Sequence, residues 1–313
     1  MDGRSVKVIA PATIANVGPG FDVFGLALQE PADVLEVSIS SEPGVRVVAV
    51  FGKGADRIPA DGKRNTAAVA AKEVLRLARS DFGLDIKIVK GIRPCSGMGS
   101  SGASAAGAAF AADLLVGSAL GPNQLVACAA KGEEASSGSM HADNVAPCLL
   151  GGFTIIRSYS PLDVVRISPP EKLGIVAVLP DVIVSTKDAR GALPAQVDLR
   201  KMVFQVGHAA SLAAGMSLGD VDLIGRSVAD AVAEPARMRL VPHLEKAERA
   251  AREAGAVAAF LGGSGPCVCA LFDKSSMDGR NIAEAIKDAY ETEGIASEAW
   301  VTSWGVGCRR SER

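Results

Sequence analysis

The chain has 313 residues, enough for two domains or one large one, and its 48% hydrophobic and 22% charged residues are typical of a globular protein. A net charge of −2 without a basic, aromatic-interleaved cluster argues against a nucleic-acid partner. There is no run of about 18 apolar residues to span a membrane, and the N-terminus lacks the apolar core of a signal peptide. Six cysteines without a CxxC pair favour free thiols in a reducing compartment, so we expect a cytoplasmic protein with no membrane partner.

The first half of the chain mixes extended segments with helices. Period-two alternation and β-favouring composition predict strands at 6–10, 21–28, 34–40, 45–50, 84–90 and 153–157. Apolar side chains at helical spacing predict helices at 65–79, 105–116 and 122–136. Residues 11–20 are expected to form a loop, and residues 141–147 a polar turn or the start of a short helix.

Pro161, Pro169 and Pro170 mark a change in composition, and we expect a boundary there between domains 1–160 and 161–313. In the second part, strands are predicted at 174–179, 256–261, 267–272 and 298–303, and helices at 199–215, 218–230, 244–255 and 278–291. Strands and helices do not alternate strictly, which favours an α+β fold over a doubly wound sheet.

A glycine- and serine-rich segment, PCSGMGSSGAS at residues 94–104, lies between a predicted strand and a predicted helix. The first turn of a helix exposes unpaired N–H groups, and the aligned peptide dipoles favour an anion there, so this segment is suited to phosphate. It is not a Walker A motif, because Gly99 stands where lysine is required, and its glycine spacing does not match a dinucleotide fingerprint. The alternative is a helix N-cap with small residues for close packing.

Two further glycine-rich segments, NVGPGFD at 16–22 and GGSGP at 262–266, flank this loop in the sequence. In this order and at this spacing, the three segments resemble the motifs of the GHMP family of small-molecule kinases, with Met98 where leucine is usual. The resemblance covers nearly the whole chain. Within the family it is to the branch that acts on L-homoserine, and it is carried by segments 11–22, 137–147, 151–153, 186–194, 234–242 and 262–266.

The resemblance implies a two-domain GHMP kinase fold of the α+β class, with an N-terminal nucleotide-binding half, a C-terminal ferredoxin-like half and the active site between them. It implies the ATP-dependent phosphorylation of L-homoserine to O-phospho-L-homoserine, a step of threonine biosynthesis, with Mg²⁺ as cofactor and a homodimer as the assembly. Alternatives are a kinase for another small alcohol, such as shikimate or mevalonate, and a non-catalytic ligand-binding member of the fold. The arginines and the HADN segment argue against the first alternative, and the intact glycine loop with Glu133 argues against the second.

The same resemblance assigns residues to the nucleotide and the metal. Backbone N–H groups of the loop would hold the ATP phosphates, and the Ser101 hydroxyl and Glu133 carboxylate would bind Mg²⁺, which prefers hard oxygen ligands. The alternative role for Glu133 and its neighbour Glu134 is that of surface charges. The alternative role for Asn65 is that of a helix N-cap. The expected ATP-binding residues are Asn65, Pro94, Ser96, Gly97, Met98, Gly99, Ser100, Ser101, Gly102 and Ser104.

Homoserine is a zwitterion, so its site needs both charges. Arg190 and Arg237 match the family's carboxylate-binding arginines, because a guanidinium holds a carboxylate with a bidentate fork. Asn16 and Asp22 match the residues that hold the ammonium group. The alternatives are surface ion pairs for the arginines and turn structure for Asn16 and Asp22.

Asn144 stands where mevalonate-type relatives place an aspartate base. An amide cannot take a proton from a hydroxyl at neutral pH. We therefore expect no strong general base: Asn144 orients the hydroxyl, and the proton leaves to the γ-phosphate or solvent in a loose transition state. Asn144, Arg190 and His141 are the expected catalytic residues, while His141 and Asp143 stay open as bases or as structural residues. Two interpretations of the turn at 262–265 stay open: it supports the active site from beneath, or it is an ordinary hairpin turn.

Overall fold

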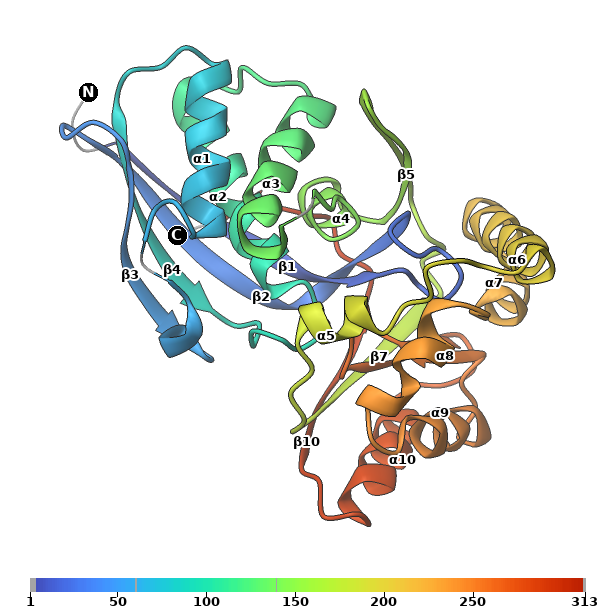
Figure 1. The fold of residues 1–313 in the computed structure, drawn as a ribbon. Helices are drawn as coiled ribbons and strands as arrows, with labels where there is room; N and C mark the ends of the chain where they lie inside the picture. Colours follow the sequence, from blue (N-terminus) through green and yellow to red (C-terminus); the bar gives the residue numbers. More distant parts are fainter. Residues whose placement is uncertain (1–3, 60, 139, 312–313) are drawn as a thin grey trace.

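The computed structural model describes residues 4–59, 61–138 and 140–311, so Ser139 of the segment 137–147 lies outside the described residues. Within them, two β-sheets lie in adjacent halves of the molecule, and each carries its own layer of helices (Figure 1). This arrangement confirms the expected α+β class.

The first sheet has the strand order β11-β1-β2-β4-β3, and β5 and β6 continue it from the other end of β2. Only β3 and β4 pair in parallel; the other described pairings are antiparallel. The strands are β1 (Ser5–Ala15), β2 (Phe24–Ser40), β3 (Val45–Gly52), β4 (Gly83–Lys90), β5 (Phe153–Tyr159), β6 (Leu162–Ile167) and β11 (Arg309–Arg310).

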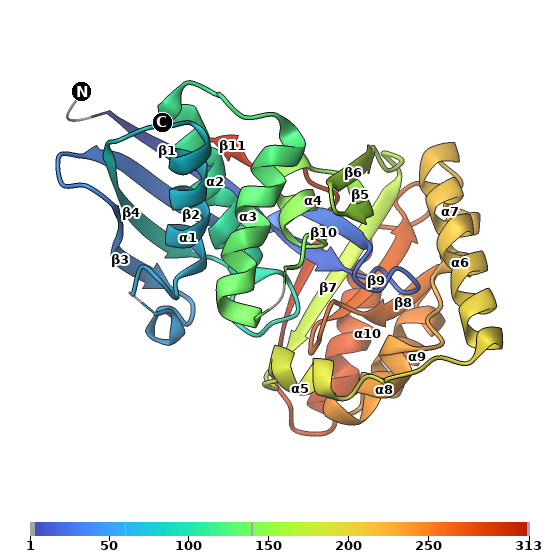
Figure 2. The same ribbon diagram turned by 45° about the horizontal axis from the view of Figure 1, so that its top comes forward.

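Three helices, α1 (Thr66–Leu77), α2 (Ser100–Val116) and α3 (Pro122–Ser137), cover one face of this sheet (Figures 1 and 2). The central helix α2 is buried along nearly its whole length, so its many alanines and glycines replace the usual polar face. Small residues also set how closely the neighbouring helices approach each other: a Cβ atom on Gly132 of α3 would lie 2.5 Å from the Thr66 carbonyl oxygen at the start of α1. The short elements α4 (Val145–Leu150) and η1 (Ala55–Arg57) complete this half.

The second sheet is fully antiparallel and has the order β10-β7-β9-β8, which is the ferredoxin-like arrangement expected for this half. Its strands are β7 (Leu173–Pro180), β8 (Ala258–Leu261), β9 (Val268–Asp273) and β10 (Ser297–Ser303). Helices α9 (Leu244–Glu253) and α10 (Arg280–Glu291) pack on it around Phe272 and Tyr290. Between β7 and α9 the chain forms α5 (Thr186–Gly191), α6 (Leu199–Leu218), α7 (Val221–Ser227), α8 (Ala233–Arg237) and η2 (Met238–Leu240).

Two sequence expectations about the first sheet were wrong. Residues 11–15 belong to β1 rather than to a loop, and the two strands expected at 21–28 and 34–40 are one strand, β2. The reason is a bulge: the β1–β2 register passes from Pro11↔Ala32 to Thr13↔Ala27, so β2 bends without ending. Its first residues then pair with β5, and its last residues pair with β4.

The strands β5 and β6 form a hairpin across the boundary expected at residue 160. Pro161 lies in the turn of that hairpin, so it does not mark a linker. Strand β11 also returns to the first sheet, beside β1. We propose that the division falls after β6, near residues 168–172, and that the first unit includes residues 309–310.

The close packing of α1 against α3 makes a testable prediction. Gly132→Ala should lower the free energy of unfolding by about 1–3 kcal/mol, because the new methyl group meets backbone that cannot move aside easily. Gly121→Ala is the control: its new Cβ atom would lie 3.6 Å from the Gln124 side-chain oxygen, so its cost should stay under about 1 kcal/mol. Urea denaturation measures both, and equal costs would contradict the packing explanation.

Candidate active site

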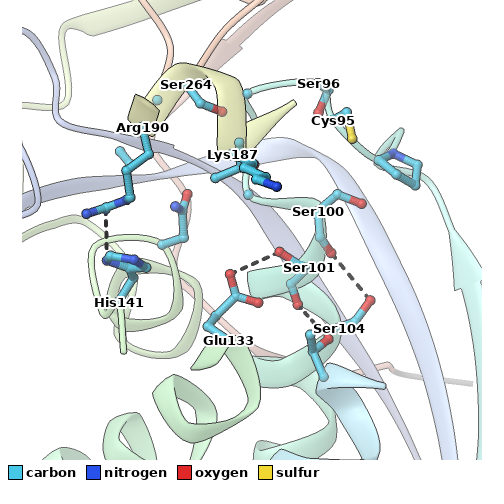
Figure 3. Close-up of a pocket in the computed structure, with 18 of the residues that line it drawn as sticks. Cys95, Ser96, Ser100, Ser101, Ser104, Glu133, His141, Lys187, Arg190 and Ser264 are labelled. Atoms are coloured by element: carbon cyan, nitrogen blue, oxygen red, sulfur yellow. Dashed lines mark hydrogen bonds between the residues drawn. The ribbon is translucent and has the colours of Figure 1, made fainter. Parts of the chain in front are cut away.

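A cleft of about 680 Å³ lies between the two halves, at the N-terminal end of α2. The first half contributes the phosphate-type loop, α3 and the segment before α4, while the second half contributes α5, α8 and the β8–β9 turn. Figure 3 shows Ser100, Ser101, Ser104 and Glu133 on one side of the cleft, with Lys187, Arg190 and Ser264 toward the other.

The three glycine-rich segments meet beneath this cleft. The Asn16 amide donates to the Gly263 carbonyl over 3.1 Å, and the Cys267 N–H donates to the Ser96 carbonyl over 3.2 Å. Gly97 has a φ of +79°, and a Cβ atom there would lie 2.5 Å from the Gly262 carbonyl oxygen. The turn at 262–265 is therefore both the β8–β9 hairpin turn and a support for the loop, so the two open interpretations are compatible.

The serines of the loop do not cap α2. The N-cap residue is Gly99, which has the left-handed conformation and no side chain that could cap the first turn. The Ser100 hydroxyl donates to the Ile92 carbonyl over 2.8 Å, and the Ser101 hydroxyl donates to Glu133 over 3.0 Å. With its hydroxyls directed elsewhere, the first turn presents backbone N–H groups and a positive dipole end, which is the arrangement that binds phosphate.

Gly99 also allows a second close approach. A Cβ atom at this position would lie 2.1 Å from the Thr13 hydroxyl and 2.7 Å from the Asn144 amide oxygen. The Thr13 hydroxyl donates to that same amide oxygen over 2.8 Å. Gly99 therefore brings the phosphate loop against the residue expected to orient the acceptor hydroxyl, and Thr13 fixes the orientation of its amide.

A buried ion pair, Lys90 with Asp33, lies directly under the loop. The Lys90 ammonium also donates to the Ser100 carbonyl over 2.8 Å and to the Ser104 hydroxyl over 3.0 Å. The other Asp33 oxygen accepts from the N–H groups of Gly91 and Ile92, over 3.0 and 3.1 Å. Burial lowers the pKa of Lys90 and raises that of Asp33, and their mutual attraction opposes both shifts.

Lys90 and Asp33 were missed by the reasoning from sequence, although a signal for each was present. Leu84, Ile86 and Ile88 alternate with polar residues along β4, and Lys90 continues the apolar series by two positions. Strand parity therefore places its side chain on the buried face. The same kind of pattern points to Asp33, because Leu35, Val37 and Ile39 alternate with more exposed residues along β2 and Asp33 precedes this buried series by two positions.

The donor set at Ser101 and Glu133 fits Mg²⁺, since a hydroxyl and a carboxylate lie within 3.0 Å of each other on α2 and α3 (Figure 3). Burial raises the pKa of the Glu133 carboxyl to about 7, and a bound cation would favour its ionised form. The described residues contain no cluster of three or more Asp, Glu, His or Cys side chains that could hold a metal. A cation here would accordingly take its remaining ligands from phosphate oxygens and water.

On the acceptor side, one Arg190 nitrogen lies 3.1 Å from each carboxylate oxygen of Asp22. The same nitrogen lies 3.3 Å from the His141 ring, whose pKa is lowered chiefly by burial (Figure 3). Arg237 is buried nearby and donates to two backbone carbonyls, those of Ala189 and Gly263. Within the described residues Arg237 forms no ion pair, so it presents a desolvated positive charge to this end of the cleft.

Asp143 is buried beside Asn144, and burial raises the pKa of its carboxyl to about 7, with further contributions from Asp22 and Glu133. The Asn65 side chain accepts from the N–H groups of Ala67 and Ala68 and so caps α1. Asn65 also lines the cleft, so the N-cap role and a place near the nucleotide are compatible.

Most of the site residues expected from sequence line this one cleft. Met98 and Gly102 do not: Met98 is fully buried beneath the loop, and Gly102 faces Asn144 and Val145. Reasoning from sequence missed several lining residues, among them Arg57, Ile58, Pro59, Arg64 and Lys187. The expected residues that line it are Asn16, Asp22, Asn65, Pro94, Ser96, Gly97, Gly99, Ser100, Ser101, Ser104, Glu133, His141, Asn144, Arg190 and Arg237.

Comparison with known proteins identifies the family to which both halves of this chain belong. Residues 65–152 match the model of the GHMP kinases N terminal domain, and residues 201–292 match that of the GHMP kinases C terminal domain. The chain is 44% identical over 305 residues to a homoserine kinase of Halobacterium salinarum, covering 97% of this chain and 96% of that protein. The chain belongs to the homoserine kinase family of GHMP kinases.

A second curated relative and a solved structure agree with this family assignment. A homoserine kinase of Pyrococcus furiosus is 41% identical over 304 residues, covering 97% of this chain and 99% of that one. The crystal structure of homoserine kinase from Cytophaga hutchinsonii superposes with a TM-score of 0.93 at 38% identity, covering 99% of each chain. The crystal structure of L. major mevalonate kinase, at 18% identity and a TM-score of 0.70, shares the fold.

The buried pair under the loop makes a testable prediction. Lys90→Met should lower the free energy of unfolding by about 3–5 kcal/mol, because it leaves the Asp33 charge buried and uncompensated. Lys87→Met is the matched control on the same strand: its partner Glu36 is 3.6 Å away and both side chains are exposed, so the cost should be about 1 kcal/mol or less. Chemical denaturation measures both variants, and a similar small loss in each would contradict the role given to Lys90.

Proposed function

We propose that this protein transfers the γ-phosphoryl group of Mg·ATP to the hydroxyl group of L-homoserine and forms O-phospho-L-homoserine. The relatives named homoserine kinase support this proposal over nearly the whole chain. The observation that carries it is the pair Asp22–Arg190 beside buried Arg237, in the same cleft as the N-terminus of α2. This constellation offers both charges to a zwitterionic acceptor, next to a place for phosphate.

Asp22 and Arg190 neutralise each other in the structure. A zwitterion can replace this contact by two complementary ones, its ammonium on Asp22 and its carboxylate on Arg190 and Arg237. Each charge of the Asp22–Arg190 pair gains an opposite charge from the zwitterion, so neither is left uncompensated when the pair separates. Asn16 supports it from below, since its amide oxygen accepts from the Asp22 N–H over 3.1 Å.

For the phosphoryl donor, we propose that the first turn of α2 holds the phosphates through its N–H groups and that Ser101 and Glu133 hold Mg²⁺. The cation supplies charge neutralisation on the phosphate oxygens. Lys90 does not serve as a P-loop lysine, because its charge is compensated by Asp33 and its other hydrogen bonds go to Ser100 and Ser104.

We propose that no side chain acts as a strong general base. The Thr13 hydroxyl bonds the Asn144 amide oxygen, and the amide can then offer its nitrogen to the acceptor hydroxyl oxygen. The hydroxyl proton leaves to the γ-phosphate or to solvent as the bond to phosphorus forms. His141 and Asp143 position the acceptor and balance its charge.

The proposal includes a cytoplasmic location and a homodimer. Six free cysteines, five of them buried, agree with a reducing compartment.

A substrate panel tests the reaction. ADP release with Mg·ATP should be fast with L-homoserine and weak with L-threonine, L-serine, shikimate and mevalonate. Arg190→Ala should raise KM for L-homoserine about 10- to 100-fold, because it removes a charge-assisted contact of about 1.5–3 kcal/mol. Arg157→Ala, which removes an exposed ion pair with Asp163 on the β5–β6 hairpin, is the control and should leave KM unchanged.

The outcomes of this panel separate the alternatives. Turnover confined to an alcohol without an amino-acid head group would keep the kinase and overturn the substrate assignment. Nucleotide binding without turnover of any acceptor would favour a non-catalytic member of the fold.

A pH–rate profile tests the absence of a base. At saturating Mg·ATP and L-homoserine, Asp143→Asn should keep kcat within about tenfold of the wild type, whereas loss of a general base costs about 10²–10⁴-fold. Asn144→Ala should lower kcat more than Asp143→Asn does, because it misorients the hydroxyl. An acidic limb near pH 7 that disappears in Asp143→Asn, together with a kcat loss of 10²-fold or more, would assign the base to Asp143.

A further inference from the structure

The phosphate-binding end of the cleft receives little positive charge from side chains of its own half. Residues 94–104 contain no lysine or arginine. Lys90 lies beneath this segment, but Asp33 compensates its charge. Phosphoryl transfer is favoured by positive charge placed on the oxygens of the transferred group. This end of the cleft would therefore gain from a cation supplied by the opposite wall.

Lys187 of α5 is a cation on that wall. It is exposed and lines the cleft, and Figure 3 shows its side chain extending into it. Among the described residues, no salt bridge or hydrogen bond holds its ammonium group, and the carboxylate of its neighbour Asp188 accepts from the Ser185 hydroxyl over 2.6 Å. Lys187 lies in the first turn of α5, where its charge opposes the helix dipole, so it does not stabilise its own helix. Its charge is available to a ligand in the cleft.

The other cations that line the cleft are placed differently. Arg57 belongs to η1 and Arg64 precedes α1, both in the first half. Arg190 contacts Asp22, and Arg237 donates to backbone carbonyls. Of the three cations that the second half contributes to the described lining, Lys187 is the one without a described partner.

The segment that leads into α5 is held beside the phosphate loop. Arg93, which directly precedes that loop, donates to the Val182 carbonyl over 3.4 Å and lies 3.0 Å from the carboxylate of Asp181. Both partners lie between the end of β7 and the start of α5. Because Lys187 follows Val182 by five residues, this contact brings the start of α5 toward the loop.

Helix α5 separates its two cations along the cleft. Lys187 and Arg190 are three residues apart, which is about 4.5 Å along a helix axis. The Arg190 guanidinium reaches the His141 ring, at the acceptor end. In Figure 3, Lys187 extends instead toward the side of the cleft on which Ser100 and Ser101 lie. One short helix thus presents one cation to the acceptor and another to the phosphate end.

We propose that the Lys187 ammonium group binds the γ-phosphate of ATP from across the cleft and remains on it during transfer. This inference rests on the proposed function, in which the first turn of α2 holds the phosphates. In the transfer, the bond from the γ-phosphorus to the oxygen shared with the β-phosphorus breaks, and the bond to the acceptor oxygen forms. Lys187 keeps its protons and balances charge on the phosphoryl oxygens. A compact ammonium with three donors suits phosphate, whereas the planar forks of Arg190 and Arg237 suit a carboxylate.

Nucleotide binding without any acceptor tests the contact. Calorimetry should compare the Mg²⁺ complexes of ADP and of an ATP analogue with an imido group between the β- and γ-phosphorus atoms. Lys187→Met should weaken binding of the analogue about tenfold or more and leave binding of ADP within about twofold, because only the analogue has a γ-phosphate. Lys274→Met is the control, since it removes an exposed lysine after β9 that does not line the cleft, and it should bind both nucleotides as the wild type does. An equal loss for both nucleotides, or no loss for the analogue, would overturn the proposal.

Steady-state kinetics give a second readout. Lys187→Met should lower kcat about 10²-fold or more and leave KM for L-homoserine within about threefold. Lys187→Arg keeps the charge and should lose less. A raised KM for L-homoserine with unchanged kcat would move Lys187 to the acceptor carboxylate and overturn the proposal.

The two experiments separate this inference from the proposed function. The binding measurement contains no acceptor, so it tests Lys187 even where L-homoserine is not turned over. A wild-type protein that binds neither nucleotide would overturn the proposed function and this inference with it. A wild type that binds the analogue no more weakly than Lys187→Met does, while it turns over L-homoserine, would overturn the inference alone if the two affinities are equal.

Discussion

The ion pair between Lys90 and Asp33 fixes where the phosphate-binding segment lies. It joins β2 and the end of β4 to the first turn of α2, through the Ser100 carbonyl and the Ser104 hydroxyl. Two buried charges are stable only while they keep each other and their hydrogen bonds, so the loop cannot shift without leaving a charge exposed to an apolar core. The result is a cradle whose geometry exists before any nucleotide arrives, which reduces the entropy lost on binding.

The acceptor side is built differently, since its contacts cross between the two halves. Asp22 comes from the loop after β1, and Arg190 comes from α5 of the second half. Gly263 accepts hydrogen bonds from Asn16 of the first half and Arg237 of the second. A change in the relative placement of the halves would therefore alter the acceptor site first, because the first turn of α2 and the Lys90–Asp33 pair beneath it both belong to the first half. Helix α6 contacts the loop that carries Asp22, because the Gln205 amide of this helix donates to the Pro19 carbonyl as well as to Asp230.

Local patterns in the sequence were sufficient for most helices and for the glycine-rich loop before α2, and the family resemblance pointed to many of the residues that line the cleft but not to Arg57 or Lys187. The local patterns failed where long-range pairing decides the structure. The single strand β2 looked like two because Pro31 and the bulge opposite Ala12 interrupt its alternation, and the hairpin of β5 and β6 was hidden by Pro161 in its turn. The partner of a buried charge is likewise a property of the tertiary fold. Strand parity points both Asp33 on β2 and Lys90 on β4 to the buried face, but it does not show that the two side chains meet.

The residues near the C-terminus complete the first sheet. Leu28 bridges to Trp304, the Gly305 N–H donates to the Ala27 carbonyl, and β11 pairs with β1. During translation, the edge of β1 thus stays open until some three hundred residues have been synthesised and have left the ribosome. The first sheet is therefore completed only when the C-terminal residues have been made. In the interval, the outer edge of β1 depends on other protection from pairing.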